Sequence, residues 1–275
     1  LDTVCGVFRA KGGVHQLPVA LAAAAGKHGV DFRYNTTITG TERTRSGRVN
    51  AVVTAEGERI EADAVVFTCD PGLAYPLLGR PTPRLTYSPS CFLMLAGVAG
   101  PHGVGAHHNL HFGDAWRTTF DEIITQGKTM SDPSFLVTVS SHGDPTMAPA
   151  GKHSYYVQFP APNTAASDLD WSTFAAPYRD HVVATLERRG YANIGSAIEF
   201  EEITTPLDWR RRGNPAGTPY NAAHTFWQTG PFRTSNLVGR NVVLAGAGTH
   251  PGIGVPMAML SGKLAAARIL GVDRA

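Results

Sequence analysis

The apolar positions of this chain alternate between strand-like and helix-like spacing, and the clearest case lies near the C-terminus. Val242, Val243 and Leu244 form an apolar run typical of an inner parallel strand, a glycine-rich turn follows, and small and apolar residues recur at helical spacing over 257–269. A helix that starts near Pro256 directs its free N–H groups and its positive dipole end at the turn. The pattern therefore predicts a turn that binds negative charge or an electron-rich carbonyl.

The N-terminal third shows the same alternation. An Ala-rich stretch predicts a helix that Gly29 ends. Alternating residues then predict a strand, a hairpin around Glu56–Gly57, and a short apolar strand that leads to Asp70. Prolines crowd the following segment, which indicates a crossing into another domain. The expected elements are a helix over 13–27 and strands over 30–39, 48–55, 59–62 and 64–68.

The middle of the chain is expected to be an antiparallel sheet backed by helices. Helical spacing over 171–189 follows Asp170 or Ser172, either of which can cap a helix. The other expected elements are strands over 91–97, 134–140 and 154–159 and a surface helix over 114–126. Together with the two ends, this pattern predicts a mixed α/β (α+β) fold.

Composition changes this picture little. The chain has 275 residues, of which 43% are hydrophobic, so it can bury a sizeable core. A net charge of +2 is too small to indicate nucleic-acid binding. The sequence shows neither an apolar run long enough to span a bilayer nor a signal peptide, and three widely spaced cysteines favour free thiols in a reducing cytoplasm. We expect a cytoplasmic protein whose contact with a membrane, if it has one, is peripheral.

Three groups of polar residues have an ordinary interpretation and a functional one. His107, His108 and His111 lack the carboxylate spacing of a metal site, so we expect a polar strand and no metal there. Asp70 is suited to cap the turn before Pro71. The arginines over 210–212 are typical of a solvated face, although they are also compatible with anionic lipid headgroups.

The longer motifs carry a resemblance to a known family. The segment THPGIGVPMAMLSGKLAA over 249–266 resembles the C-terminal flavin-binding segment of the bacterial-type phytoene desaturases, which are the carotenoid branch of the FAD-dependent amine oxidase superfamily. The segment GVFRAKGGVHQLPVALAAAAGKHGVDFRYNTTITG over 6–40 is similar to the part of that family which returns the chain to its FAD domain. The resemblance covers nearly the whole chain and corresponds to the C-terminal half of the family.

This resemblance implies a domain organisation. Residues 1–85 and 235–275 would form part of a Rossmann-like FAD-binding domain, and residues 86–234 a substrate domain of sheet and helices. Family members begin with a βαβ unit that carries G-x-G-x-x-G and holds the FAD pyrophosphate, and this unit is absent here. We therefore expect a fragment of a protein about twice as long, which on its own binds FAD poorly and is inactive.

The resemblance also implies site residues. His250 would lie beside the flavin, Phe226 and Trp227 would line the cavity of a long polyene, and the catalytic residues stay unknown. Ile38 would contact adenine through its main chain, and the backbone near Asp70 would lie close to the dinucleotide. The remaining residues expected to bind FAD belong to the turn and the helix start, namely Gly246, Gly248, Thr249, Gly252, Gly254, Val255, Pro256 and Met257.

The activity implied by the resemblance is the desaturation of a long isoprenoid hydrocarbon, phytoene or a related carotenoid precursor, by hydride transfer to the flavin N5 in carotenoid biosynthesis. Such an oxidoreductase relies on its cofactor for the difficult step. The alternatives are another member of the superfamily, which would isomerise carotenoids or oxidise retinoids, amines or porphyrinogens, and a non-catalytic interaction domain. The choice of carotenoid, the number of steps, the electron acceptor and the oligomeric state are not encoded in any recognisable motif.

Overall fold

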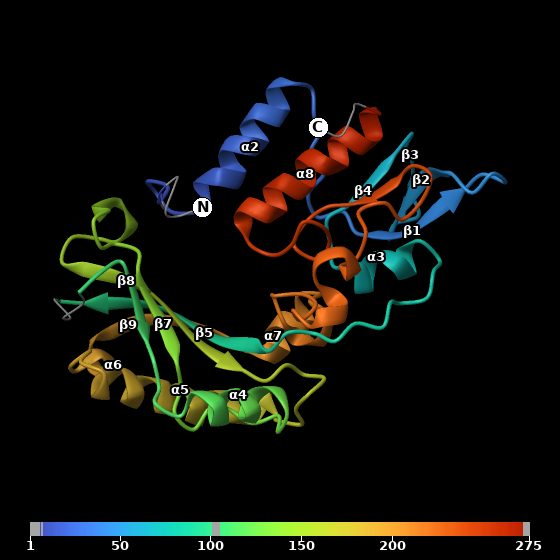
Figure 1. The fold of residues 1–275 in the computed structure, drawn as a ribbon. Coiled ribbons are helices and arrows are strands. Elements are labelled where there is room, and N and C mark those ends of the chain that lie inside the picture. Colours follow the sequence, from blue (N-terminus) through green and yellow to red (C-terminus); the bar gives the residue numbers. More distant parts are fainter. Residues whose placement is uncertain (1–5, 7, 101–104, 272–275) are drawn as a thin grey trace. The chain divides into compact units, whose positions relative to one another are not determined.

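The strands of the described residues form three sheets, and the computed structural model describes residues 6, 8–100 and 105–271 (Figure 1). The largest sheet has the order β6-β7-β8-β5-β9, and two smaller ones have the orders β1-β2-β3 and β10-β4. The mixture of sheets and helices confirms the predicted α/β class. The chain divides into a first unit of residues 1–34, 91–161 and 169–205 and a second unit of residues 35–90, 162–168 and 206–275.

The first unit is built on the five-stranded sheet. Its strands are β5 (Ser90–Ala99), β6 (His108–His111), β7 (Phe135–Val139), β8 (Lys152–Ala161) and β9 (Ile198–Thr204). Helices α4 (Trp116–Ile124) and α5 (Trp171–Arg188) run along one face of this sheet (Figure 1). Phe92 on β5 is fully buried there, and its ring lies 5.0 Å from that of Tyr178 on α5. This face therefore carries the core of the unit.

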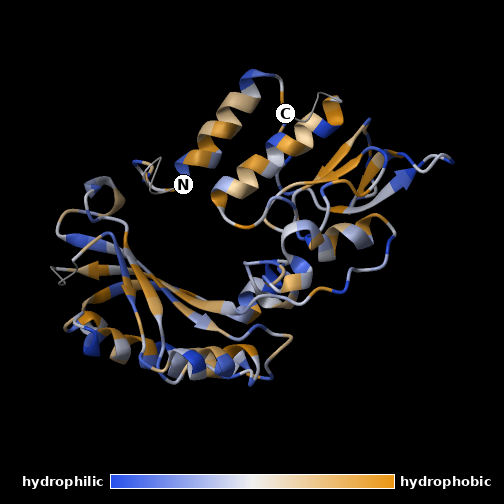
Figure 2. Ribbon diagram, in the orientation of Figure 1, coloured by the Kyte–Doolittle hydropathy of each residue, from blue (hydrophilic) through white to orange (hydrophobic). Residues whose placement is uncertain are grey.

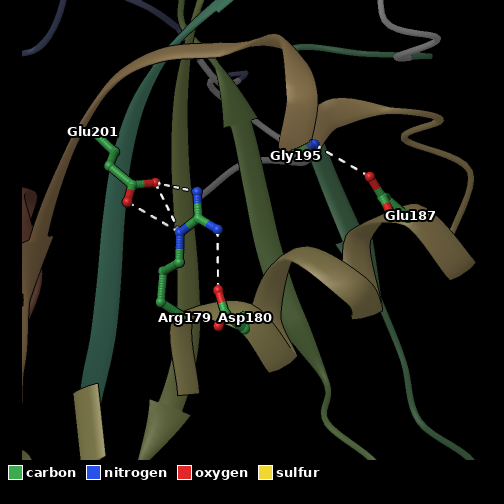
Figure 3. Close-up of polar contacts among 5 residues, drawn as sticks. All are labelled: Arg179, Asp180, Glu187, Gly195 and Glu201. Atoms are coloured by element: carbon green, nitrogen blue, oxygen red, sulfur yellow. Dashed lines mark hydrogen bonds and ion pairs between the residues drawn. The ribbon is translucent and has the colours of Figure 1, made fainter. Parts of the chain in front are cut away.

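Polar contacts fix α5 to the edge of the sheet (Figure 3). Asp170 caps the helix, since its carboxylate accepts a hydrogen bond from the Ser172 amide at 3.0 Å. Further along, the Arg179 guanidinium donates through Nε at 3.0 Å and through Nη2 at 2.9 Å to the carboxylate of Glu201 on β9. The bidentate geometry holds helix and strand in one register.

Helix α2 (Gln16–Lys27) also belongs to the first unit, together with the short α6 (Ile194–Ala197) and the 3-10 turn η1 (Pro145–Met147). The loop before α2 is anchored by a hydrogen bond of 2.8 Å from the Gly12 amide to the Asp144 carboxylate. No residue of α2 is buried, and the orange colour along this helix in Figure 2 marks its hydrophobic residues.

The second unit combines the two smaller sheets. The hairpin sheet contains β1 (Ile38–Arg43), β2 (Val49–Thr54) and β3 (Arg59–Glu61), while β4 (Val65–Phe67) and β10 (Val242–Leu244) form a parallel pair. Its helices are α3 (Pro71–Leu77), α7 (Pro206–Arg211) and α8 (Val255–Leu270), and its 3-10 turns are η2 (Pro215–Gly217), η3 (Phe226–Gln228) and η4 (Gly230–Phe232). One buried cluster joins Val49 of β2 to Phe67 of β4 and Leu244 of β10.

The Asn241 side chain connects the two sheets of this unit. Its amide nitrogen donates to the carbonyls of Val49 at 2.6 Å and Asp63 at 2.7 Å, and its amide oxygen accepts from the Val49 amide at 3.0 Å. The buried Asn241 amide thus uses both its N–H donors and its carbonyl acceptor. Its hydrogen bonds link the two sheets where no backbone ladder of the described residues joins them. The start of β10 is thereby tied to a hairpin that lies far away in sequence.

One expected strand was wrong. Residues 30–37 are not a strand, and Ile38 begins β1 rather than ending a strand over 30–39. A turn occupies Tyr34 and Asn35, and Asn35 has φ of 56°, which interrupts an extended backbone. The expected helix over 13–27, the hairpin and the helices over 114–126 and 171–189 are confirmed to within a few residues.

The two units group the chain differently from the domains expected above. Residues 1–34 lie with the five-stranded sheet, and residues 206–234 lie with β4 and β10. The expectation had placed 1–85 and 235–275 together and 86–234 apart. Which part binds a cofactor and which binds a substrate stays a prediction.

Candidate functional site

The parallel pair β4–β10 creates the edge at which the candidate site lies. Val242 pairs with Val65 and Leu244 with Phe67, so both strands end at the same edge. In open parallel sheets, ligands bind beyond the carboxyl ends of the strands. The segment after β4 and the glycine-rich turn after β10 meet there: a Cβ added to Gly246 would lie 3.1 Å from the Thr68 carbonyl oxygen.

The four glycines of the turn have two different roles. A Cβ on Gly248 would lie 2.5 Å from Cδ of Pro71, so Gly246 and Gly248 let the two segments pack closely. Gly252 and Gly254 have no such neighbour closer than 4.0 Å. Gly254 has φ of 99° and ψ of 154°, a conformation that essentially only glycine adopts. These last two glycines therefore serve the backbone conformation of the turn rather than close packing.

Helix α8 begins directly after Gly254, and its N-terminus carries no side-chain cap. Pro256 occupies the first turn and has no N–H to satisfy, while the first helical bond runs from the Ala258 amide to the Gly254 carbonyl at 2.9 Å. Within the described residues, the amides of Val255 and Met257 have no acceptor. The predicted helix start is confirmed, and it presents free donors and a positive dipole end.

Buried polar side chains fix the beginning of the turn. Ser261 on α8 is fully buried, and its hydroxyl accepts from the Gly246 amide at 2.6 Å and donates to the Ala258 carbonyl at 2.6 Å. Asn236 donates to the carbonyls of Leu244 at 3.1 Å and His250 at 2.9 Å. Neither Ser261 nor Asn236 is marked by a sequence pattern, because a single serine or asparagine has no characteristic spacing.

Asp70 occupies the other side of the edge. Its Oδ1 accepts from the Gly72 amide at 2.7 Å and from the Tyr87 hydroxyl at 3.0 Å, which confirms the expected turn cap. Its Oδ2 is buried and has no hydrogen-bond partner in the described part of the chain. Burial raises the pKa of this carboxyl above its ordinary value, although both hydrogen bonds oppose the shift. A contact between this segment and a dinucleotide stays a prediction.

The other expected residues lie in different places. Ile38 opens β1 in the hairpin sheet and pairs with Thr54. His250 belongs to the turn, where its amide donates to the Thr234 carbonyl at 3.2 Å. Phe226 and Trp227 are both 71% exposed, and each ring lies within 5.6 Å of that of Phe232. The structure thus brings His250 to the turn and gathers the aromatics into an exposed cluster.

The histidines over 107–111 have separate partners. His107 lies 2.8 Å from an Arg9 nitrogen, His108 lies 2.7 Å from the Thr138 hydroxyl, and His111 lies 2.9 Å from the Tyr191 hydroxyl. Among the described residues there is no cluster of three His, Cys, Asp or Glu side chains suited to a metal ion. Likewise, no helix in the described ranges has the length and hydropathy needed to cross a membrane.

The first unit contains a separate pocket of about 510 Å³. Its floor is the sheet face opposite the core, where Leu136 pairs with Gln158 and Thr138 pairs with Tyr156. The loop before α2 and the start of that helix form a wall, with the side chains of Phe8, Val14, Leu17 and Met147. Polar groups lie at Arg9, His107 and Asp144. The pocket is mainly apolar, as a site for a hydrophobic ligand is.

Comparison with known proteins assigns the chain to a family. The model of the flavin containing amine oxidoreductase family matches residues 1–270. The chain belongs to this family. It is 48% identical to a phytoene dehydrogenase of Streptomyces griseus over 98% of this chain and 54% of that protein. It is 34% identical to a zeta-carotene-forming phytoene desaturase of Myxococcus xanthus over 96% of this chain and 53% of that protein. These similarities support the carotenoid desaturase branch, and the chain spans about half the length of these relatives.

Solved structures with low sequence identity share the fold. An oxidoreductase from Methanosarcina mazei matches with a TM-score of 0.60 at 13% identity, over 92% of this chain and 55% of that one. The cyclohexylamine oxidase of Brevibacterium oxydans matches with a TM-score of 0.55 at 14% identity, over 95% of this chain and 53% of that one. These two matches show that the fold is shared with known oxidoreductase structures.

The turn and the start of α8 fit the flavin that the family name implies. A flavin needs hydrogen-bond donors and a positive potential where negative charge collects, and the free amides of Val255 and Met257 at the end of the helix dipole supply both. A Cβ on Gly252 would meet no atom within 4 Å, so the backbone of the turn is not packed against another segment at this position. That these residues bind FAD stays a prediction.

Proposed function

We propose that the complete protein is an FAD-dependent oxidoreductase that desaturates a long isoprenoid hydrocarbon, phytoene or a related carotenoid precursor. The observation that carries this proposal is the uncapped N-terminus of α8, placed behind a glycine turn at the carboxyl edge of β4 and β10. The similarity to two carotenoid desaturases supports the choice of substrate class.

The roles proposed for the chain's residues are binding and orientation of the cofactor and the substrate. FAD, when bound, would supply the chemistry by accepting a hydride from one carbon of the substrate, and the adjacent carbon would lose a proton to complete the double bond. The amides of Val255 and Met257 would donate to the pyrimidine edge of the ring and favour its reduced, negatively charged form. Gly254 holds the backbone in the conformation that starts the helix at this point.

The apolar pocket of the first unit is the proposed binding site for part of the hydrocarbon. Leu136, Leu17 and Met147 offer aliphatic surface, and Tyr156 offers an aromatic one. A hydrocarbon makes no hydrogen bonds, so its affinity comes from apolar area removed from water, at about 25 cal/mol per Å². Arg9 and His107 lie at a polar end of the pocket that a hydrocarbon cannot satisfy, and this end would limit how far the substrate enters.

The experiment starts with the complete gene product, purified without added flavin. Its absorption spectrum should show a bound flavin, and addition of phytoene in detergent micelles should produce longer conjugated polyenes, detected by absorption after chromatography. A protein without flavin would refute the cofactor proposal. A flavoprotein that forms no new polyene from phytoene or from shorter or partly desaturated precursors would refute the desaturase proposal alone.

The surroundings of the protein are part of the proposal. We propose a cytoplasmic protein that contacts the membrane peripherally, because its hydrocarbon substrate is soluble only in lipid. Sedimentation of the purified protein with neutral and with anionic vesicles measures this contact. Recovery of all protein in the supernatant with both vesicle types would argue against it.

A further inference from the structure

Arg233 is a buried cation directly behind the glycine turn. Its side chain is only 6% exposed, and its Nε donates to the Thr249 carbonyl at 3.0 Å while Nη2 donates to the Ala247 carbonyl. Burial lowers the pKa of the guanidinium, and no carboxylate of the described residues offsets this effect. Burial of a charge that only carbonyl dipoles compensate costs desolvation free energy. Ion pairing therefore does not explain why an arginine is buried here.

The two hydrogen bonds determine how the peptide groups of the turn face. The Ala247–Gly248 peptide is trans, so the Gly248 N–H points away from the guanidinium that binds the Ala247 carbonyl. Within the described residues, the Gly248 amide has no acceptor. A buried backbone donor is nearly always paired, which indicates that this amide is available to a ligand.

The Thr249–His250 peptide group is held from both sides. Arg233 binds the Thr249 carbonyl, and the His250 amide donates to the Thr234 carbonyl at 3.2 Å. The Thr249 hydroxyl donates to the same Thr234 carbonyl at 2.8 Å. Residues 233 and 234 therefore bracket the turn, and Arg233 is the member that contacts two of its carbonyls at once.

We propose that Arg233 is a positioning residue for the cofactor: it orients the turn so that the Gly248 amide faces the ligand, and its unneutralised charge makes that ligand preferentially anionic. This inference rests on the proposed flavin site and goes beyond it, because it assigns the orientation of the turn to one side chain outside the glycine motif. The planar guanidinium suits the task, since Nε and Nη2 form a rigid fork that a lysine ammonium cannot reproduce.

The test compares Arg233→Lys and Arg233→Met in the complete protein, with Arg240→Met as the matched control. Arg240 is an exposed arginine of the same unit, so its loss removes one positive charge without touching the turn. The dissociation constant of FAD is measured by titration of the apoprotein, and thermal unfolding of each apoprotein is recorded alongside. We expect both Arg233 variants to raise the dissociation constant by about ten- to a hundredfold. The control should change it by no more than about twofold.

The reduction potential separates orientation from charge. If the buried charge favours the anionic reduced flavin tenfold, Arg233→Met lowers the two-electron reduction potential by about 30 mV. Arg233→Lys keeps the positive charge, so its potential should stay close to that of the wild type. A purely structural arginine would lower the unfolding temperature but leave FAD affinity and potential of the folded protein unchanged, and that outcome overturns the inference. A wild-type protein without flavin refutes the proposed function instead.

Two further measurements keep the inference testable if a variant does not fold. A cavity of about 510 Å³ reaches Arg233 and Gly248, so methylguanidinium can enter the space left in Arg233→Ala and should restore FAD binding. Thr249→Val removes only the hydroxyl bond to Thr234 and leaves the charge in place, and it should weaken FAD binding about fivefold. Absence of rescue together with unchanged affinity in Thr249→Val would overturn the inference.

Discussion

Substitution of Gly254 by alanine is expected to weaken flavin binding without a steric clash. A Cβ at this position would come no closer than 4.0 Å to Cδ of Pro256, so space is sufficient. The cost is the backbone conformation, φ of 99° and ψ of 154°, which for a residue with a side chain amounts to about 1–3 kcal/mol. If the free protein relaxes and the bound protein must restore this conformation, the dissociation constant of FAD rises by about five- to 150-fold.

The control lies in the same helix. Gly262 is exposed in the middle of α8, and a Cβ there would meet nothing within 4 Å. Gly262→Ala should therefore stabilise the helix by about 0.5–1 kcal/mol and leave FAD binding unchanged. Titration of each apoprotein with FAD, together with urea unfolding, measures both effects. Equal affinity of Gly254→Ala and the wild type would show that the ligand does not depend on the conformation at the helix start.

Three further substitutions test the surroundings. Gly248→Ala places a Cβ 2.5 Å from Cδ of Pro71 and should cost about 1–3 kcal/mol in urea unfolding; an unchanged midpoint would contradict the close approach. Tyr178→Phe removes a buried hydroxyl that has no partner among the described residues and should raise the free energy of unfolding by about 1 kcal/mol, whereas a loss of that size would reveal a missed hydrogen bond. Asp70 keeps its proton to higher pH in the folded state than its ordinary pKa of 3.8 allows in the unfolded chain. The wild type should therefore lose stability relative to Asp70→Asn as pH rises from this value through the raised pKa, and a pH-independent difference would count against burial of the carboxyl.

Local signals explain which elements the sequence predicts well. The hairpin is predicted because Glu56–Gly57 separates two alternating runs, and α5 is predicted because Asp170 caps a helical apolar pattern. The prediction of a strand over 30–39 is wrong because a strand needs a neighbouring strand to pair with, and no described strand pairs with residues 30–37. Strand β9 was not predicted, because Glu199, Glu201 and Glu202 mask its alternation, as charged side chains often do on an edge strand.

The candidate site divides in the same way. The glycine turn and the helix start can be predicted from the sequence. Gly254 permits the positive φ before the helix, and Pro256 suits its first turn because it needs no hydrogen-bond acceptor. Arg233, Asn236 and Ser261 act through contacts with residues eight to sixteen positions away, and no spacing rule marks a buried arginine in advance. The sequence thus predicts the shape of the turn, while the groups that orient it emerge only from tertiary packing.

The parallel pairing of β4 with β10 has a consequence for the newborn chain. Val65 and Val242 are neighbours in the sheet, yet a ribosome must add everything between them before the pair can close. The strands from β5 to β9 are synthesised before β10, so their sheet can assemble first. During this time the apolar residues of β4 have no strand to pair with. Until β10 has been synthesised, Val65 and Phe67 therefore lack their strand partners, and closure of this pair follows assembly of the five-stranded sheet.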